Sequence, residues 1–278
     1  MVRFSAFADE IAPDLKTQMA VCAANGVRCI DVRGIDNINV SKFTVAQAKA
    51  HKRQMDGEGF TVPCIGSPLG KVRIDEAFAA HLDLTRHCCD IARAFDSPFV
   101  RIFSFYGREG GNILNHRQQV MDNLAAMVAA ATDAGIVLLH ENESAIYGEK
   151  PDQVKDIFAT IASPNLKGIF DPSNFVAAGV KPFDEGWKCG LAELTDYFHI
   201  KDKVPGEAAS VPAGEGAGQI AETLADAKAR GFDGFLTLEP HLKAAGQFKG
   251  FTGPDLFVKA VDALKRVCEQ VGMEYGRP

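Results

Sequence analysis

Four residues that can bind a metal or carry a proton stand at the ends of four successive apolar segments. Glu141 ends IVLLHE, Asp171 ends LKGIFD, His199 lies in YFHIK and Glu239 ends GFLTLE. Three carboxylates and an imidazole buried together would be poorly hydrated and would repel one another unless a positive charge compensates them. A divalent cation does so most simply, and mixed oxygen and nitrogen ligation suits Mn²⁺, Mg²⁺, Co²⁺ or Fe²⁺. The pattern therefore predicts one divalent metal ion held by these four side chains.

Alternating short and long segments must position these residues. The short apolar segments predict strands at residues 2–7, 27–33, 60–66, 99–105, 136–141, 166–171, 197–201 and 234–239. The longer segments have amphipathic helical spacing, at residues 13–26, 44–59, 76–95, 116–135, 151–161, 186–194, 219–231 and 254–272. Near-continuous apolar strands that alternate with helices indicate a parallel sheet covered on both faces.

Eight strand–helix units in 278 residues are typical of an α/β TIM barrel, so we predict a single (β/α)8 domain over residues 1–278. A doubly wound open sheet is the alternative, but no GxGxxG follows the first strand. The Gly- and Ala-rich stretch at 205–219 predicts a loop, and the loop at 241–255 is a candidate to close over the site. In a TIM barrel, catalytic groups lie at the carboxyl ends of the strands, where the four residues stand.

Strand alternation divides the residues of LHENE at 139–143. If Glu141 points into the barrel, His140 points toward the helices, so we expect His140 to be packed or hydrogen-bonded and not a ligand. Glu143 shares the parity of Glu141 but lies beyond the strand. For Asn142 and Glu143 the sequence leaves open a role in loop structure or in support of the site.

Composition excludes several classes of protein. The net charge is −6 and no Lys/Arg-rich run is present, which argues against a nucleic-acid partner. The seven cysteines include no CxxC and are expected to be buried, reduced thiols. No signal-peptide pattern and no apolar stretch of about 18 residues is visible. We therefore expect a cytoplasmic protein that is not embedded in a membrane.

The chain resembles the xylose-isomerase-like TIM barrels over essentially its whole length, in the branch of sugar isomerases and epimerases. The similar motifs are GVRCIDVRG, LLHENE, GIFDPSNF, FHIKD and LEPHL. Resemblance to the ketose 3-epimerases implies that the four residues bind one metal ion, with Mn²⁺ the first choice. It also implies that Glu141 and Glu239 are the catalytic acid/base pair. One glutamate would remove a proton α to a carbonyl, and the other would return a proton to the opposite face of a metal-stabilised enediolate.

The resemblance also bears on substrate contacts. Many relatives have His three residues after the strand-six aspartate, where this chain has Asn174, and this difference leaves the substrate open. Lys201, Arg33 and His241 are the other candidate substrate-binding residues. Arg101 is either a further substrate contact or a core ion-pair partner of Asp31. The expected partner is a small-molecule carbohydrate, and many relatives form homo-oligomers, either dimers or tetramers.

We therefore predict a metal-dependent sugar isomerase or epimerase. The main alternative is a metal-dependent dehydratase or lyase that acts on a keto-sugar or keto-polyol, because the same proton abstraction would start an elimination. A DNA-repair endonuclease of the same fold is disfavoured by the acidic charge. A non-catalytic sugar-binding protein is the remaining alternative.

Overall fold

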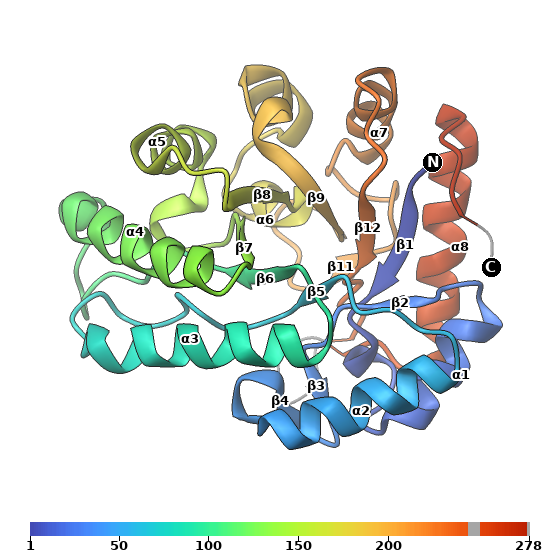
Figure 1. The fold of residues 1–278 in the computed structure, drawn as a ribbon. Helices are drawn as coiled ribbons and strands as arrows, with labels where there is room; N and C mark the ends of the chain where they lie inside the picture. Colours follow the sequence, from blue (N-terminus) through green and yellow to red (C-terminus); the bar gives the residue numbers. More distant parts are fainter. Residues whose placement is uncertain (244–250, 277–278) are drawn as a thin grey trace.

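Eight parallel strands form the centre of the protein (Figure 1). The computed structural model describes residues 1–243 and 251–276. The strands are hydrogen-bonded in the order β2-β1-β12-β9-β8-β7-β6-β5. Their bounds are β1 Arg3–Ala6, β2 Cys29–Ile30, β5 Cys64–Ile65, β6 Phe99–Ile102, β7 Val137–Glu141, β8 Leu166–Phe170, β9 Thr195–Ile200 and β12 Phe235–Leu238.

The two ends of this sheet meet and close it into a barrel. The backbone N–H of Ile30 donates to the carbonyl of Thr61 at 3.0 Å, and that of Val32 donates to Cys64 at 3.1 Å. Parallel bridges join the same two segments. The predicted TIM barrel fold is therefore confirmed, and the doubly wound alternative is wrong.

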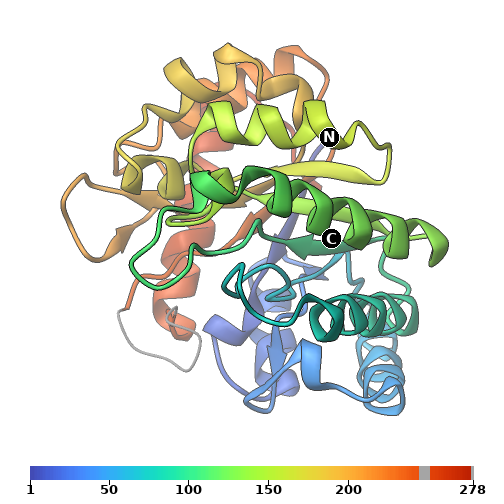
Figure 2. The same ribbon diagram turned by 90° about the vertical axis from the view of Figure 1, so that its left-hand side faces the viewer.

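Helices surround the barrel on its outer side (Figures 1 and 2). Their ends carry ordinary stop and start signals. Thr44 and Gln47 form a reciprocal capping box at the start of α2, and Gly272, at φ 64°, ends α8 in the left-handed conformation that favours glycine. The bounds are α1 Leu15–Ala24, α2 Val45–Gly57, α3 Phe78–Ala94, α4 Arg117–Asp133, α5 Pro151–Ile161, α6 Pro172–Ala177, α7 Ile220–Ala229 and α8 Pro254–Val271.

One predicted helix is wrong. Residues 186–194 form short turns instead. Gly190 adopts φ 110°, which prevents a continuous helix between the turns Trp187–Cys189 and Ala192–Leu194. The helix of this unit is instead the short α6, which begins directly after β8. Asp171 caps it by accepting a hydrogen bond from the backbone N–H of Asn174, and Pro172 fills its first position.

Two small hairpins rise from the carboxyl ends of the strands. Gly34–Ile35 (β3) pairs with Ile38–Asn39 (β4), and Asp202–Lys203 (β10) pairs with Ser210–Val211 (β11). The stretch 205–219, predicted as a loop, thus contains β11. Buried Asp202 holds this stretch in place by accepting hydrogen bonds from the backbone N–H groups of Gly214, Gly216 and Gly218 at 2.8–3.0 Å.

Of the loop predicted at 241–255, the structure describes residues 241–243 and 251–255. Residues 244–250, including Lys249, lie outside the described residues. Both flanks are anchored on Glu10, whose carboxylate accepts hydrogen bonds from the backbone of His241 and the hydroxyl of Thr252, at 2.9 and 2.7 Å. This anchoring holds His241 beside the mouth of the barrel.

The barrel interior is filled below the site by an inner cluster that includes Leu139, Ile169 and Tyr197. All seven cysteines are free thiols, and every one except Cys189 is buried, which confirms the expectation for most of them. In the described ranges 1–243 and 251–276, no helix combines the length and apolar content needed to cross a bilayer.

Candidate metal centre and active site

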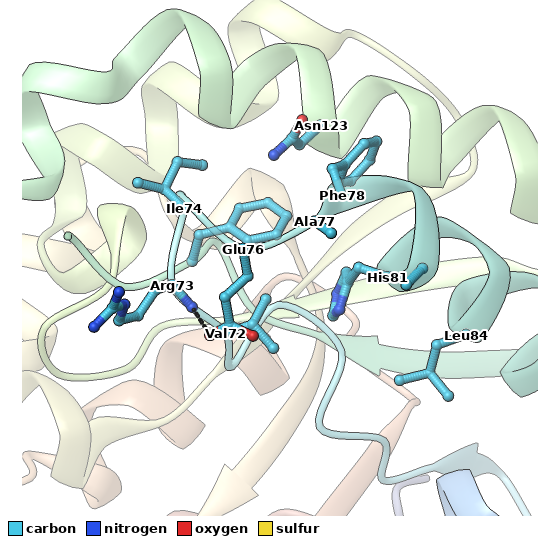
Figure 3. Close-up of a pocket in the computed structure, with 11 residues that line it drawn as sticks. Val72, Arg73, Ile74, Glu76, Ala77, Phe78, His81, Leu84 and Asn123 are labelled. Carbon is cyan, nitrogen blue, oxygen red and sulfur yellow. Dashed lines mark hydrogen bonds between the residues drawn. The ribbon is translucent and has the colours of Figure 1, made fainter.

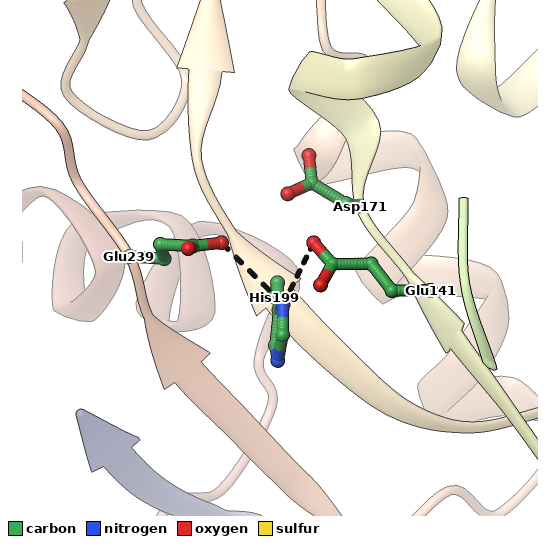
Figure 4. A group of neighbouring side chains, drawn as sticks. All are labelled: Glu141, Asp171, His199 and Glu239. Carbon is green, nitrogen blue, oxygen red and sulfur yellow. Dashed lines mark ion pairs between the residues drawn. The ribbon is translucent and has the colours of Figure 1, made fainter. Parts of the chain in front are cut away.

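Strand alternation places the four predicted ligands on one layer of the barrel. Glu141, Asp171 and His199 each stand two residues beyond a member of the inner cluster, so their side chains also point inward. Glu239 follows the end of β12. All four are at least 96% buried, and each offers a ligand atom within 4.8 Å of the others (Figure 4).

His199 lies between the two glutamates (Figure 4). Its Nδ1 is 3.0 Å from Oε1 of Glu141 and 3.4 Å from Oε2 of Glu239. Burial opposes protonation of His199, but the two carboxylates raise its pKa to about 9. Burial also acts against the charge of Glu141, but His199 and Arg101 lower the pKa of Glu141 to about 2. Both glutamates are thus carboxylates near neutral pH, as a proton acceptor must be.

Asp171 is held at the junction of β8 and α6. Its Oδ1 accepts the hydrogen bond from the backbone N–H of Asn174 that caps α6, whereas its Oδ2 lies 3.0 Å from Nζ of Lys201. Burial raises the pKa of Asp171 to about 7, although the Lys201 charge acts in the opposite direction. Asn142 fixes the backbone of Asp171 by two hydrogen bonds of 2.9 Å: its Oδ1 accepts from the N–H of Asp171, and its Nδ2 donates to the carbonyl of Asp171.

Two buried arginines hold the outer oxygens of the glutamates. Arg101 Nη1 lies 3.1 Å from Oε2 of Glu141, and Arg33 Nη1 lies 3.1 Å from Oε1 of Glu239. The guanidinium groups also lie 4.7 and 4.8 Å from the ring centre of Phe7. The suggested Arg101–Asp31 ion pair is therefore wrong.

Asp31 is satisfied by hydroxyl groups instead. Its carboxylate accepts hydrogen bonds from Ser5, Tyr197 and Thr237 at 2.7–2.9 Å. Burial raises the pKa of Asp31 above its usual value, although the hydrogen bonds from these hydroxyls act in the opposite direction. Neutral hydroxyl donors, and not the expected guanidinium of Arg101, therefore satisfy the Asp31 carboxylate.

The structure also brings the other predicted contact residues to the site. Nδ2 of Asn174 donates to the carbonyl of Asn142 at 2.9 Å and to Oε1 of Glu141 at 3.3 Å. Lys201 Nζ lies 3.4 Å from Oε2 of Glu239, and His241 Nε2 lies 3.5 Å from its Oε1. Burial acts against the charge of Lys201, but the acidic neighbours raise its pKa well above the usual value.

Asp9 and Glu10 were missed by the sequence analysis, although they follow β1 directly in FADE. Asp9 Oδ2 lies 2.8 Å from Nε of Arg33, and Glu10 Oε1 lies 3.1 Å from Nε2 of His241. Their position just beyond the end of a barrel strand is the signal that could have identified them.

A cavity of about 150 Å³ opens over these groups. It is lined by Arg33, Arg101, Glu141, Lys201, Glu239 and His241, together with the ion pair of Lys71 and Glu143 (2.8 Å). His140 lies outside it, as alternation predicted. The Nε2 of His140 is 3.0 Å from Oγ of Ser104, and burial lowers the pKa of His140 to about 4.

The donor set fits a divalent metal ion. Three carboxylates and one imidazole converge in a buried layer, where Asp171 Oδ2 and His199 Nδ1 have ion-pair contacts but no hydrogen bond among the described residues. Oxygen-rich ligation with one nitrogen suits a hard or borderline cation. A cation held here would supply a Lewis acid beside two ionised carboxylates that line one cavity.

Another cavity, of about 270 Å³, lies at the start of α3 (Figure 3). Its lining includes Phe78, His81, Leu84, Phe105 and Asn123. None of the predicted site residues contributes to this lining, so we do not assign the chemistry to it.

Comparison with known proteins agrees with this fold. A family model described as xylose isomerase-like TIM barrel matches residues 19–267. A search of curated proteins gives no match.

Solved structures give the same fold. The probable 3-DHS dehydratase AsbF from Bacillus anthracis has a TM-score of 0.75 and 15% identity, covering 95% of this chain and 99% of that chain. A D-tagatose 3-epimerase-like protein has a TM-score of 0.75 and 19% identity, covering 98% of each chain. The IolI protein with a bound zinc atom has a TM-score of 0.74 and 15% identity, again covering 98% of each.

Proposed function

The chain belongs to the xylose isomerase-like TIM barrel family, and from this premise we propose that it is a divalent-metal-dependent sugar isomerase or epimerase. The observation that carries the proposal is the placement of Glu141 and Glu239 on either side of His199, at the edge of a cavity of about 150 Å³. Two carboxylates that flank one substrate carbon can exchange a proton on its two faces.

Glu141, Asp171, His199 and Glu239 would hold the metal ion, which we propose to be Mn²⁺, with Mg²⁺, Co²⁺ or Fe²⁺ as alternatives. The similarly folded IolI protein binds a zinc atom, which supports metal binding by a barrel of this kind. When bound, such an ion supplies positive charge that polarises a carbonyl and stabilises the negative charge left by loss of an α-proton.

The protein's own groups would manage the proton. One glutamate would take the α-proton from the substrate, and the other would give a proton to the opposite face. Arg101 and Arg33 each hold one carboxylate at 3.1 Å and so keep it oriented toward the cavity. Both glutamates have lowered pKa values, which keeps them ready to accept a proton near neutral pH.

Substrate hydroxyls would meet a polar rim. Lys201, His241 and Arg33 line the cavity, and Asn174 donates a hydrogen bond to Glu141 from its edge. Cationic donors of this kind bind hydroxyl and carbonyl oxygens, so we propose a small-molecule carbohydrate with a keto group as the substrate class.

A metal-dependent dehydratase or lyase is the second candidate. It is favoured by the fold likeness to the probable dehydratase AsbF and by His241, which lines the same cavity at 3.5 Å from Glu239. A histidine there could protonate a departing hydroxyl group after the α-proton has been removed.

The test is proton exchange in D₂O. Metal-loaded protein is incubated with a panel of ketoses and keto-sugars, and NMR follows loss of the α C–H signal. We expect exchange together with a new stereoisomer. Exchange that yields a new ultraviolet enone absorbance would support the dehydratase or lyase. Absence of exchange with every member of the panel would overturn both candidates.

A further inference from the structure

A cavity of about 390 Å³ adjoins the candidate metal centre on the side of the β10–β11 hairpin. Lys201 and His241 line both this cavity and the one of about 150 Å³, so the two spaces share a wall. From that wall the larger cavity extends to Lys203 on β10, Ser210 on β11 and Lys243. We call the part formed by Lys203, Ser210 and Lys243 the outer subsite.

The outer subsite differs in charge from the metal centre. Lys203 and Lys243 line the larger cavity beside Lys201, whose charge is paired with Asp171 and Glu239, and no described residue that lines this cavity is acidic. In the smaller cavity the cations face carboxylates: Arg101 faces Glu141 at 3.1 Å, and Lys71 faces Glu143 at 2.8 Å. A cationic wall in a chain of net charge −6 concentrates positive potential at one place.

The Lys203 ammonium has more N–H donors than the hydrogen bonds that it forms in the described structure. Its ammonium donates to the carbonyl of Ala208 at 3.2 Å, the hydrogen bond that the described structure gives it, and an ammonium carries three N–H donors. Its backbone is held by pairing with Ser210 and by the neighbouring Asp202, whose carboxylate binds the backbone of the Gly-rich loop. The Lys203 side chain is therefore carried by a backbone segment that is held in place.

We propose that the outer subsite binds a carboxylate or phosphate group attached to the keto-sugar whose reacting carbon lies between Glu141 and Glu239. This inference rests on the proposed function. The smaller cavity takes the reacting part of the sugar, Lys201 and His241 stand at the passage, and the anionic group reaches Lys203 and Lys243. The hydroxyl of Ser210 can donate a further hydrogen bond to the anion.

The experiment compares ligands that share one ketose. Calorimetry measures the Kd of D-fructose, D-fructose 6-phosphate and D-fructuronate for the metal-loaded full chain. Lys203→Gln removes the charge, Lys203→Arg restores it, and Lys155→Gln on the outer helix α5 is the matched control. We expect the anionic ligands to bind more tightly than D-fructose, and Lys203→Gln to weaken only their binding, by about tenfold, as for one charge-assisted hydrogen bond.

Lys203→Arg should recover most of this loss, and Lys155→Gln should change nothing. A dependence limited to one anionic ligand identifies whether phosphate or carboxylate is recognised. The subsite is refuted if neither anionic ligand binds more tightly than D-fructose, or if Lys203→Gln weakens all three ligands equally. Because binding is measured apart from turnover, Lys203-dependent binding without C–H exchange would refute the proposed function alone. Exchange without Lys203 dependence would refute the subsite alone.

Discussion

The side-chain amide of Asn142 pairs with both backbone hydrogen-bonding groups of Asp171. Its Oδ1 accepts from the N–H and its Nδ2 donates to the carbonyl, each at 2.9 Å, and both residues are buried. The amide thus fixes the end of β7 to the residue that caps α6. The orientation of the Asp171 carboxylate toward the other three ligands depends on this pair.

Replacing Asn142 by Ala should weaken metal binding. Loss of a group that orients a ligand typically costs about 10- to 100-fold in metal affinity, and we expect a fall in this range without loss of the fold. Competition with a chelating dye gives the affinity. Asn165→Ala is the control, because Asn165 also donates from its side chain to a backbone carbonyl, that of Ile136 at 3.1 Å, but at the opposite end of the barrel. Equal affinities of the wild type and Asn142→Ala would contradict the assigned role.

Glu141→Gln and Glu239→Gln should each lower the rate by at least the roughly 10²- to 10⁴-fold expected for a positioned acid or base. The loss should be larger if a metal ligand is disturbed as well. Initial rates of C–H exchange in D₂O provide the measurement. Glu149→Gln is a suitable control, since half-buried Glu149 ends the short turn Tyr147–Glu149 after β7 and accepts a hydrogen bond from the backbone of Ala145. Near wild-type exchange in either glutamine variant would rule out the two-carboxylate scheme.

Sequence was sufficient for the parts of this site that obey strand alternation. Glu141, Asp171 and His199 converge because each lies at the end of a buried parallel strand with inward parity, and His140 points away for the same reason. The barrel itself follows from eight repeats of one pattern, which local propensity and periodicity reveal without any long-range information.

Side-chain contacts between residues on different strands could not be predicted in this way. Arg101 was expected to contact the substrate or to pair with Asp31, but it meets Glu141 on the neighbouring strand β7, while hydroxyls satisfy Asp31. Asn142 stands beyond the last regular strand position, where alternation no longer fixes direction. The missing helix at 186–194 has another cause: Gly190 adopts a left-handed conformation that overrides the amphipathic spacing.

Metal removal should destabilise the protein. Without the cation, the three buried carboxylates are compensated by the side chains of His199, Lys201, His241 and the arginines. A metal at about 100 times its Kd adds roughly 2.7 kcal/mol of stability. For a chain of this size that corresponds to a rise in Tm of about 5 °C. Elemental analysis should give one metal per chain, and calorimetric scans before and after chelation should show the shift. Asp171→Asn should largely abolish the response. A Tm that chelation leaves unchanged would argue against a bound metal.

His81, which lies outside the metal centre, should make folding stability depend on pH. Its Nε2 accepts a hydrogen bond from the backbone N–H of Gly70 at 2.9 Å, so that nitrogen carries no proton in the folded state. Burial lowers the pKa of His81 below its ordinary value of 6.5, with Glu76 opposing the shift. Between the folded and unfolded pKa values the unfolded chain binds more protons. Stability that is present above about pH 6.5 is therefore lost as the pH falls through the folded pKa.

The His81→Gln variant keeps an acceptor of similar reach but does not titrate. Urea unfolding of the metal-saturated protein at pH 7.5 and pH 5.5 should show a smaller loss of stability for this variant than for the wild type. His87→Gln, on the same helix and only partly buried, serves as the control and should retain the wild-type dependence. If His81→Gln lost as much stability over this interval as the wild type, protonation of His81 would not be the source of the effect.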